Sequence, residues 1–193
     1  MKLLHIDSSI LGGNSASRQL SREVVARWQA RVPGLRVIYR DLAAEPLAHL
    51  SGASLAQTDP EETQRNAQTL EQFLAADVIV IGAPMYNFAI PSQLKAWIDR
   101  ILVAGKTFRY TPSGAEGLAG GKRVIIAVAR GGVYAADSPL EFAESYLRQV
   151  FAFVGVPDVT VVRAEGLALS PQQRNEALRQ ALESIAPPLE IAA

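Results

Sequence analysis

The segment Val78-Ile79-Val80-Ile81-Gly82-Ala83-Pro84-Met85-Tyr86-Asn87-Phe88 joins an uninterrupted apolar run to a loop that holds two aromatic rings, an amide and a thioether. An apolar run without alternation is typical of a strand that is buried on both faces of a sheet. A second proline, Pro91, fixes the other end of the loop. Ligands of open α/β sheets bind outside the carboxyl ends of the strands. The segment therefore predicts a site for a flat heterocycle with hydrogen-bonding edges.

Strand and helix patterns alternate on both sides of this segment, which is typical of βαβ units around a parallel sheet. The clearest helix pattern follows Pro91, where apolar residues recur at helical spacing from Leu94 to Leu102. Two stretches, Ala43–Asp59 and Gly105–Gly121, have no regular pattern and are expected to be irregular. The expected strands and helices, in chain order, are Lys2–Asp7, Ser15–Val32, Leu35–Arg40, Pro60–Ala75, Val78–Gly82, Ser92–Ala104, Lys122–Ala129, Leu140–Val154, Asp158–Arg163 and Ser170–Ile185. Five strands and five helices predict an α/β fold, a doubly wound three-layer sandwich in which Leu35–Arg40, the least apolar strand, lies at an edge.

The length and amino-acid composition of the chain limit the classes of function that it can have. The chain has 193 residues, which predicts one domain over 1–193. Lys plus Arg equals Asp plus Glu at 19 each, so charge gives no support for nucleic acid or a membrane surface as partner. The absence of cysteine excludes thiolate chemistry, and His5 and His49 lack zinc-site spacing, so no metal is expected. No apolar run reaches the roughly 18 residues of a membrane span, and the amino-terminal segment resembles a strand more than a signal peptide, so a cytoplasmic protein is expected.

The turn after the first strand is the first of three loops that could carry chemistry. It reads Ser8-Ser9-Ile10-Leu11-Gly12-Gly13-Asn14-Ser15-Ala16-Ser17 and opens a helix. Free N–H groups and the partial positive charge of a helix amino terminus bind phosphate, and serine hydroxyls add donors. The alternative is structural, because Ser15 or Ser17 could simply cap the helix and the glycine pair could simply turn.

The other two loops are Pro84–Pro91 and Arg130-Gly131-Gly132, which follow the third and fourth strands. Each also has a structural alternative: aromatic rings that pack on the sheet edge, and glycines in an ordinary turn. In a flavodoxin-like strand order, 2-1-3-4-5, the carboxyl ends of strands one, three and four meet around the switch point. One loop would bind phosphate and the other two would hold a ring system, which favours flavin mononucleotide (FMN).

Other enzyme motifs are missing. The chain has no GxSxG or GxGxxG pattern, and Arg123 after Gly120-Gly121-Lys122 replaces the Ser or Thr of a phosphate-binding P-loop. His5 lies inside the first expected strand and is expected to be packed rather than catalytic.

With these loops in view, the chain resembles the FMN-dependent NADH:quinone oxidoreductases of the bacterial azoreductase family. The resemblance extends over nearly the whole chain, and its most specific piece is Met85-Tyr86-Asn87-Phe88. Further matching pieces are Ser9 with Ser15-Ala16-Ser17, Phe108-Arg109-Tyr110-Thr111, Arg130-Gly131-Gly132 and Ala164-Glu165-Gly166.

The resemblance implies a flavodoxin-like homodimer with one FMN per subunit and active sites at the dimer interface. It implies that Ser9, Ser15, Ala16 and Ser17 hold the FMN phosphate and that Met85, Tyr86, Asn87 and Phe88 line the isoalloxazine, with Asn87 at its reactive edge. It further implies that Ala129, Arg130, Gly131 and Gly132 hold the pyrimidine side, with Ala129 where relatives often carry Ser. Substrate-pocket positions fall on Phe88, Tyr110, Tyr134 and Phe153, and the catalytic candidates are Asn87 and Tyr110.

The implied activity is hydride transfer in two steps, with NADH or NADPH as donor and a quinone or an aromatic azo compound as acceptor, in ping-pong order. The sequence does not decide between NADH and NADPH. A flavodoxin-type electron carrier with a protein partner is the main alternative, and a flavodoxin-like scaffold with an empty site is a further one. Three aromatics on one expected helix, Tyr146, Phe151 and Phe153, exceed what a single face buries and also suggest a dimer.

Overall fold

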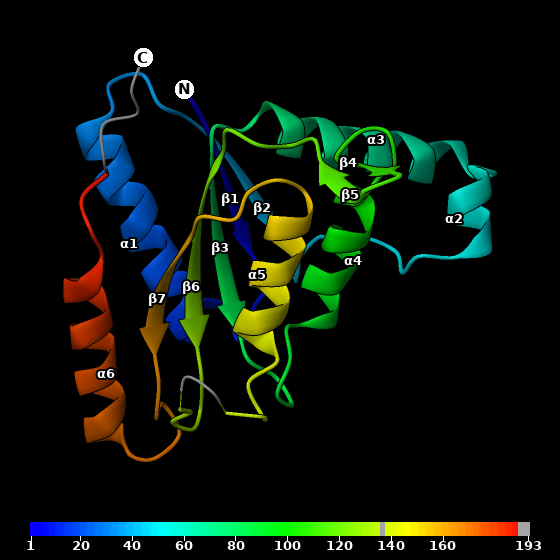
Figure 1. Cartoon of the computed structure of the whole chain (residues 1–193). Coiled ribbons are helices and arrows are strands. Elements are labelled where there is room, and N and C mark those ends of the chain that lie inside the picture. Colours follow the sequence, from blue (N-terminus) through cyan, green and yellow to red (C-terminus); the bar gives the residue numbers. More distant parts are fainter. Residues whose placement is uncertain (136–137, 189–193) are drawn as a thin grey trace.

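The computed structural model describes residues 1–135 and 138–188 and contains a central parallel sheet of five strands (Figure 1). The strand order is β2-β1-β3-β6-β7, and a separate two-stranded sheet pairs β4 with β5. When the five parallel strands are counted along the chain, β6 is the fourth and β7 is the fifth, so the order is 2-1-3-4-5. This order confirms the predicted doubly wound, flavodoxin-like arrangement. The strands are β1 (Lys2–Asp7), β2 (Arg36–Asp41), β3 (Val78–Pro84), β4 (Phe108–Thr111), β5 (Gly114–Gly117), β6 (Arg123–Ala129) and β7 (Val159–Ala164).

The burial of each strand follows its place in the sheet. All seven residues of β3 are buried at the centre, whereas none of the residues of the edge strand β2 is fully buried. The register places Asp7 opposite Gly82 and Pro84 opposite Ala129. Because β1, β3 and β6 end at nearly the same level, the loops that follow them emerge side by side at one edge.

Helices cover both faces of the sheet (Figure 1). On one face α1 and α6 bury apolar residues such as Trp28 and Leu178 against the sheet, and on the other α3, α4 and α5 bury Phe73, Trp97 and Leu147. These two clusters are the two hydrophobic cores of a three-layer sandwich. The helices are α1 (Ala16–Arg31), α2 (Gly52–Ala56), α3 (Pro60–Ala75), α4 (Ser92–Ile101), α5 (Ala143–Phe153) and α6 (Pro171–Ser184), with a short 3₁₀ turn η1 (Gly12–Asn14).

The expectation of an irregular segment over Gly105–Gly121 was wrong. This stretch contains the antiparallel hairpin β4–β5, in which Arg109 pairs with Glu116 at 2.8 Å on an exposed surface. Figure 1 shows the hairpin at the end of the sheet opposite the arrowheads of the parallel strands. Strands of four residues that include glycine give too few alternations to be recognised in the sequence.

Other element boundaries also differ from the prediction, each for a local reason. The helix α2 forms inside Ala43–Asp59, where Ser51 and Ser54 make a capping box. The helix α4 ends at Ile101 rather than Ala104, since the Thr107 hydroxyl donates to the Ile101 carbonyl at 2.7 Å.

The boundary of α5 bears on the suggested dimer. The helix begins at Ala143 rather than Leu140, because the Glu141 carboxylate accepts the Glu144 N–H and caps the first turn. Phe151 on this helix is fully buried in the core of its own chain, which removes one of the three aromatics that suggested a dimer. Among the residues described, no helix has the length and apolar character needed to cross a membrane.

Candidate functional site

A cleft of about 260 Å³ opens at the carboxyl edge of the sheet, between the loops that follow β1, β3 and β6. The three loops that the sequence singled out, which lie far apart along the chain, therefore meet at one place. None of the described residues that line the cleft is acidic. Its walls are formed by Ser9, Leu11, Ser15, Ala16, Pro84, Met85, Tyr86, Ala129, Arg130, Gly131, Leu167, Ala168 and Arg174.

The first wall is the serine loop, residues 8–17, which leads into α1. Ser15 is the N-cap of α1 and accepts the Arg18 N–H at 3.3 Å, so the capping interpretation is correct for this residue. The first N–H groups of a helix have no preceding helical carbonyl to bond, which leaves those of Ala16 and Ser17 as free donors at the cleft end of α1. The Ser17 hydroxyl is fully buried beside that of Ser15, at 3.1 Å. Capping and anion binding are therefore compatible at this loop.

A buried arginine fixes the backbone of the serine loop. The guanidinium of Arg18, on the first turn of α1, donates to the Ser9 carbonyl at 2.7 and 3.2 Å. The same group forms a two-pronged pair with Asp41 at the end of β2, at 2.6 and 2.7 Å. The hydrogen bond from Arg18 holds the pKa of Asp41 below its usual value, and further hydrogen bonds from Ala43 and Ala44 act in the same direction. The charge of Arg18 is thus matched locally and serves to position the loop.

A polar chain beneath the serine loop explains two further features. The Asp7 carboxylate accepts from Ser21 at 2.8 Å and from Tyr39 at 3.1 Å. Burial, followed by the nearby Asp7 charge, raises the pKa of Tyr39 to about 12, so its hydroxyl stays protonated as a donor. His5 is buried and bonds Ser21 at 3.0 Å, in agreement with a packed role. Gly82 must lack a side chain because a Cβ there would collide with the Asp7 carboxylate.

The second wall ends in a tight turn over residues 86–89. Tyr86 and Ala89 exchange both backbone hydrogen bonds, at 2.9 and 3.1 Å. The two central residues both have positive φ, 48° at Asn87 and 71° at Phe88. Asn tolerates this left-handed region, whereas a bulky residue such as Phe is strained there, by about 1–3 kcal/mol. The strained turn leaves Phe88 46% exposed, and the lining of the cleft includes Tyr86 of this turn but neither Asn87 nor Phe88.

Tyr86 connects this turn to the serine loop. Its hydroxyl lies 3.1 Å from the Ser9 hydroxyl and accepts the Ile10 N–H at 3.2 Å. The resemblance placed Tyr86 only at the ring of the cofactor. The structure shows that its polar end reaches the serine loop, so two walls of the cleft share hydrogen bonds.

The third wall is the glycine loop, residues 130–132, at the end of β6. The Met85 N–H donates to the Ala129 carbonyl at 2.8 Å, which ties this wall to the second one. The loop is also held by the segment after β7, since Leu167, Ala168 and Gly166 donate to the carbonyls of residues 130, 131 and 132 at 2.9–3.1 Å. Leu167 and Ala168 therefore form part of the cleft, although the sequence did not identify them.

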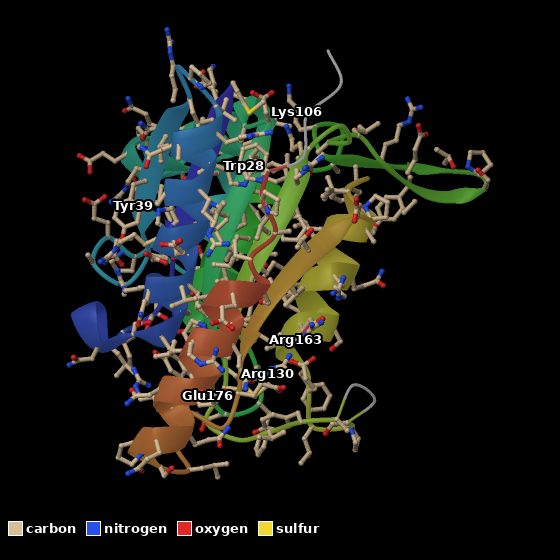
Figure 2. All side chains as sticks on the ribbon, turned by 90° about the vertical axis from the view of Figure 1, so that its left-hand side faces the viewer. Trp28, Tyr39, Lys106, Arg130, Arg163 and Glu176 are labelled. Atoms are coloured by element: carbon tan, nitrogen blue, oxygen red, sulfur yellow. The ribbon has the colours of Figure 1, made fainter. Side chains whose placement is uncertain are left out.

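The Arg130 side chain is held among carboxylates, although its residue also lines the cleft. It is buried and pairs with Glu141, Glu144 and Glu165 at 2.9–3.0 Å, while its Nε has no hydrogen-bond partner among the residues that the structure describes. These groups line a separate charged pocket of about 400 Å³ that also contains Tyr134, and Figure 2 shows Arg130 close to Arg163 in this region. Burial works to raise the pKa of Glu144, but hydrogen bonds from Arg163 and Arg148 outweigh it and lower that pKa.

Two predicted substrate-pocket residues lie elsewhere in the chain. Tyr110 is on β4 and is 77% exposed, and Phe153 ends α5. Both rings contact Phe108, with ring centroids 5.5 and 4.7 Å apart. Figure 1 shows the β4–β5 hairpin and the end of α5 at the opposite end of the sheet from the carboxyl ends of the parallel strands, where the cleft lies. Within a single chain the structure does not bring Tyr110 or Phe153 to the cleft.

Arg174, on the first turn of α6, is the functional candidate that the sequence analysis missed. It lines the cleft and donates to the Asn14 carbonyl of η1 at 2.9 Å. A signal for it was present, because a basic residue in the first turn of a helix opposes the helix dipole. Among residues 1–135 and 138–188, no cluster of side chains suited to a metal ion is found.

Comparison with known proteins agrees with this architecture. A family model described as a flavodoxin-like fold matches residues 1–187. An FMN-dependent NADH:quinone oxidoreductase of Stenotrophomonas maltophilia (strain K279a) is 60% identical, with 96% of this chain and 94% of that protein covered. An FMN-dependent NADH:quinone oxidoreductase 1 of Pseudomonas putida (strain KT2440) is 54% identical over the full length of both.

Solved structures give the same picture. An azoreductase from Bacillus anthracis str. Sterne superposes with a TM-score of 0.86 at 30% identity and covers 96% of each chain. An FMN-dependent NADH-azoreductase from B. anthracis str. Ames Ancestor, in complex with FMN, superposes with a TM-score of 0.84 at 26% identity, covering 96% of this chain and 98% of that one. The chain therefore belongs to the flavodoxin-like family of FMN-dependent NADH:quinone oxidoreductases and azoreductases.

Proposed function

We propose that this protein is an FMN-dependent oxidoreductase that takes electrons from NADH and reduces quinones. The observation that carries the proposal is the cleft itself. It combines a serine loop at a helix amino terminus with the loop that contributes Met85 and Tyr86, at the carboxyl edge where β1 and β3 are neighbours. That edge is the switch point at which a flavodoxin-like sheet binds FMN.

The residues present fit FMN. The serine loop offers free N–H groups and hydroxyls to a phosphate, and no carboxylate lines the cleft to repel it. Met85, Ala129 and Gly131 offer apolar and backbone surfaces to a flat ring. We propose that Ser9, Ser15, Ala16 and Ser17 hold the phosphate. In this proposal residues 85–88 and 129–132 hold the isoalloxazine, through the backbone in the case of Arg130 because its side chain is occupied by glutamates.

Bound FMN would supply the redox chemistry, namely two-electron transfer as hydride between NADH and the acceptor. The chain would supply position and electrostatics. The Asn87 amide, held at the strained turn, would face the reactive edge and stabilise charge there, and Phe88 would cover the stacked substrate. Within residues 1–135 and 138–188, no histidine or carboxylate lines the cleft, and the chain has no cysteine, so we propose that protons for the reduced product come from water.

The finer proposal is a ping-pong order, with azo compounds as further acceptors. If donor and acceptor use the same face of one ring, they bind in turn, and initial-rate lines at varied NADH and quinone are parallel. Rapid bleaching of the flavin spectrum by NADH without oxygen, followed by return of colour with a benzoquinone, supports the enzyme. Bleaching by dithionite but by neither NADH nor NADPH would instead indicate an electron carrier with a protein partner.

We also propose a homodimer whose active sites lie at the interface, a prediction that gives Tyr110 and Phe153 a role. A second chain would bring its hairpin end to the cleft of the first, since neither residue reaches the cleft of its own chain. Light scattering at micromolar concentration should give the mass of a dimer. Co-refolded mixtures of Asn87→Ala and Tyr110→Ala chains test the shared site. If each site uses Asn87 of one chain and Tyr110 of the other, mixed dimers contain one intact site and activity returns. No recovery in a proven mixed dimer contradicts the proposal.

A further inference from the structure

One of the cationic side chains that line the cleft has no ion-pair partner among the described residues. Two arginines line the cleft, and Arg130 is matched by three glutamates. For Arg174, no carboxylate in the described part of the chain lies within ion-pair distance. The cation of Arg174 is therefore the uncompensated charge of the cleft.

The position of Arg174 in its helix makes this charge costly. It lies in the first turn of α6, where the helix dipole is positive and no acidic residue is present to offset it. Its hydrogen bond to the Asn14 carbonyl holds it beside the amino terminus of α1, a second positive helix end. Two helix ends and one guanidinium thus concentrate positive potential at a single place, which favours the binding of an anion there.

We propose that Arg174 recognises the phosphate monoester of the bound flavin and makes the site select FMN over riboflavin. The inference rests on the proposed function and adds a residue outside the loops that define the family resemblance. Arg174 has five N–H donors, of which one is used by Asn14, so donors remain for phosphate oxygens. The serine loop supplies only neutral donors, whereas Arg174 adds one full positive charge toward the two negative charges of a phosphate dianion.

The experiment compares the dissociation constants of FMN and riboflavin for the apo full-length protein, measured by flavin fluorescence. Arg174→Gln should weaken FMN about tenfold, the low end of a charge-assisted hydrogen bond, and change riboflavin less than about twofold. Arg174→Lys should recover most of the FMN affinity, because it keeps the charge. The wild type should also lose FMN affinity more steeply with added salt than Arg174→Gln does.

A matched control lies on the same helix. Arg179→Gln removes an equal charge from an exposed residue that pairs with Glu176 and Glu183, and it should leave both flavin affinities unchanged. This comparison separates recognition by Arg174 from a general change in net charge.

Four outcomes would overturn the inference. Equal losses of FMN and riboflavin affinity would give Arg174 a structural role through Asn14 alone. Unchanged affinities for both flavins would give Arg174 no role in flavin binding. A raised KM for NADH with unchanged FMN affinity would assign it to the dinucleotide. Each of these leaves the proposed function standing, whereas a wild-type protein that binds neither flavin ends both proposals.

Discussion

The serine loop and the turn over residues 86–89 are joined at the cleft by Tyr86, but they are built in opposite ways. The serine loop is relaxed: its only left-handed residue is Gly12, with φ of 52°, and Arg18 holds the Ser9 carbonyl from beneath. The turn places Asn87 and Phe88 in left-handed conformations, and Phe88 remains half exposed. The serine loop is thus held in place by hydrogen bonds, whereas the turn is held in a strained backbone conformation.

The difference matches what each wall would bind in the proposed FMN site. A phosphate is held by several N–H groups that must converge in advance, so the backbone that carries them has to be rigid. A flat ring and a substrate stacked on it need an exposed amide and an exposed aromatic ring instead. A turn with positive φ at both central residues provides this, at a conformational cost that folding elsewhere must offset. Four measurements would break or sharpen this contrast.

The largest effect is expected when the anchor of the serine loop is removed. Arg18→Met deletes the hydrogen bonds to Ser9 and leaves Asp41 without its cation. We expect the free energy of unfolding to fall by about 2–3 kcal/mol and FMN binding to weaken strongly. Urea unfolding at pH 7 measures the first effect and flavin titration the second. Arg22→Met, an exposed arginine on the same helix, is the control. Equal behaviour of the two variants would contradict the anchoring role.

A substitution that relieves the strain in the turn over residues 86–89 should raise the free energy of unfolding rather than lower it. Phe88→Gly relieves the positive φ and is expected to stabilise the protein by about 1 kcal/mol while lowering turnover of quinone. Phe88→Ala also removes the ring but keeps a Cβ, so it should lose turnover without gaining stability. The melting temperatures of the two variants therefore separate backbone strain from loss of the ring. If glycine destabilises the protein as much as alanine does, the turn stores no strain.

Removing the connection between the two walls should have a smaller effect. Tyr86→Phe deletes the hydroxyl that contacts Ser9 and the Ile10 N–H, and we expect a loss of about 0.5–1 kcal/mol in stability. It should also weaken FMN more than riboflavin, because the lost contacts belong to the serine loop. Tyr146→Phe, which removes a hydroxyl from α5 near Lys95, is the control. In a double-mutant cycle, Tyr86→Phe and Ser9→Ala should be non-additive. Additive losses would mean that the two walls act independently.

The smallest effect on stability is expected when the pH is lowered and Asp41 is protonated. The hydrogen bond from Arg18 lowers the pKa of Asp41 from its ordinary value of 3.8, so the folded pKa lies below the unfolded one. The contribution of Asp41 to stability is therefore complete above the unfolded pKa and is lost as pH falls through the folded pKa. Protonation leaves the side chain in place, so the loss is smaller than that of Arg18→Met. Unfolding free energies from pH 7 to pH 3 should fall less for Asp41→Asn than for the wild type. Parallel curves would exclude Asp41 from the acid response.

The parts of the structure that the sequence predicted are those with strong local patterns. The buried run of β3 and the helical spacing of α4 were readable because each extends over many residues. The serine loop was readable because glycine and serine at the start of a helix have a known backbone chemistry. The β4–β5 hairpin was not readable, because strands of four residues are too short to show an alternating pattern in the sequence. Arg174 was missed for a related reason, because its partner, Asn14, lies 160 residues away in the chain.

The sequence by itself determined the alternation of strands and helices, hence the three layers, and the three loops that follow the first, third and fourth strands, because apolar periodicity and turn residues act over short distances. The strand order 2-1-3-4-5 was expected from a flavodoxin-like arrangement, and the structure confirmed it. Only the tertiary structure decided how those loops are supported. It placed Arg18 beneath Ser9, enclosed Arg130 among three glutamates and brought Arg174 to the cleft. It also left Tyr110 at the far end of its own chain. Long charged side chains can reach many partners from one position in the sequence, and only the packing of distant elements selects which partner each one meets.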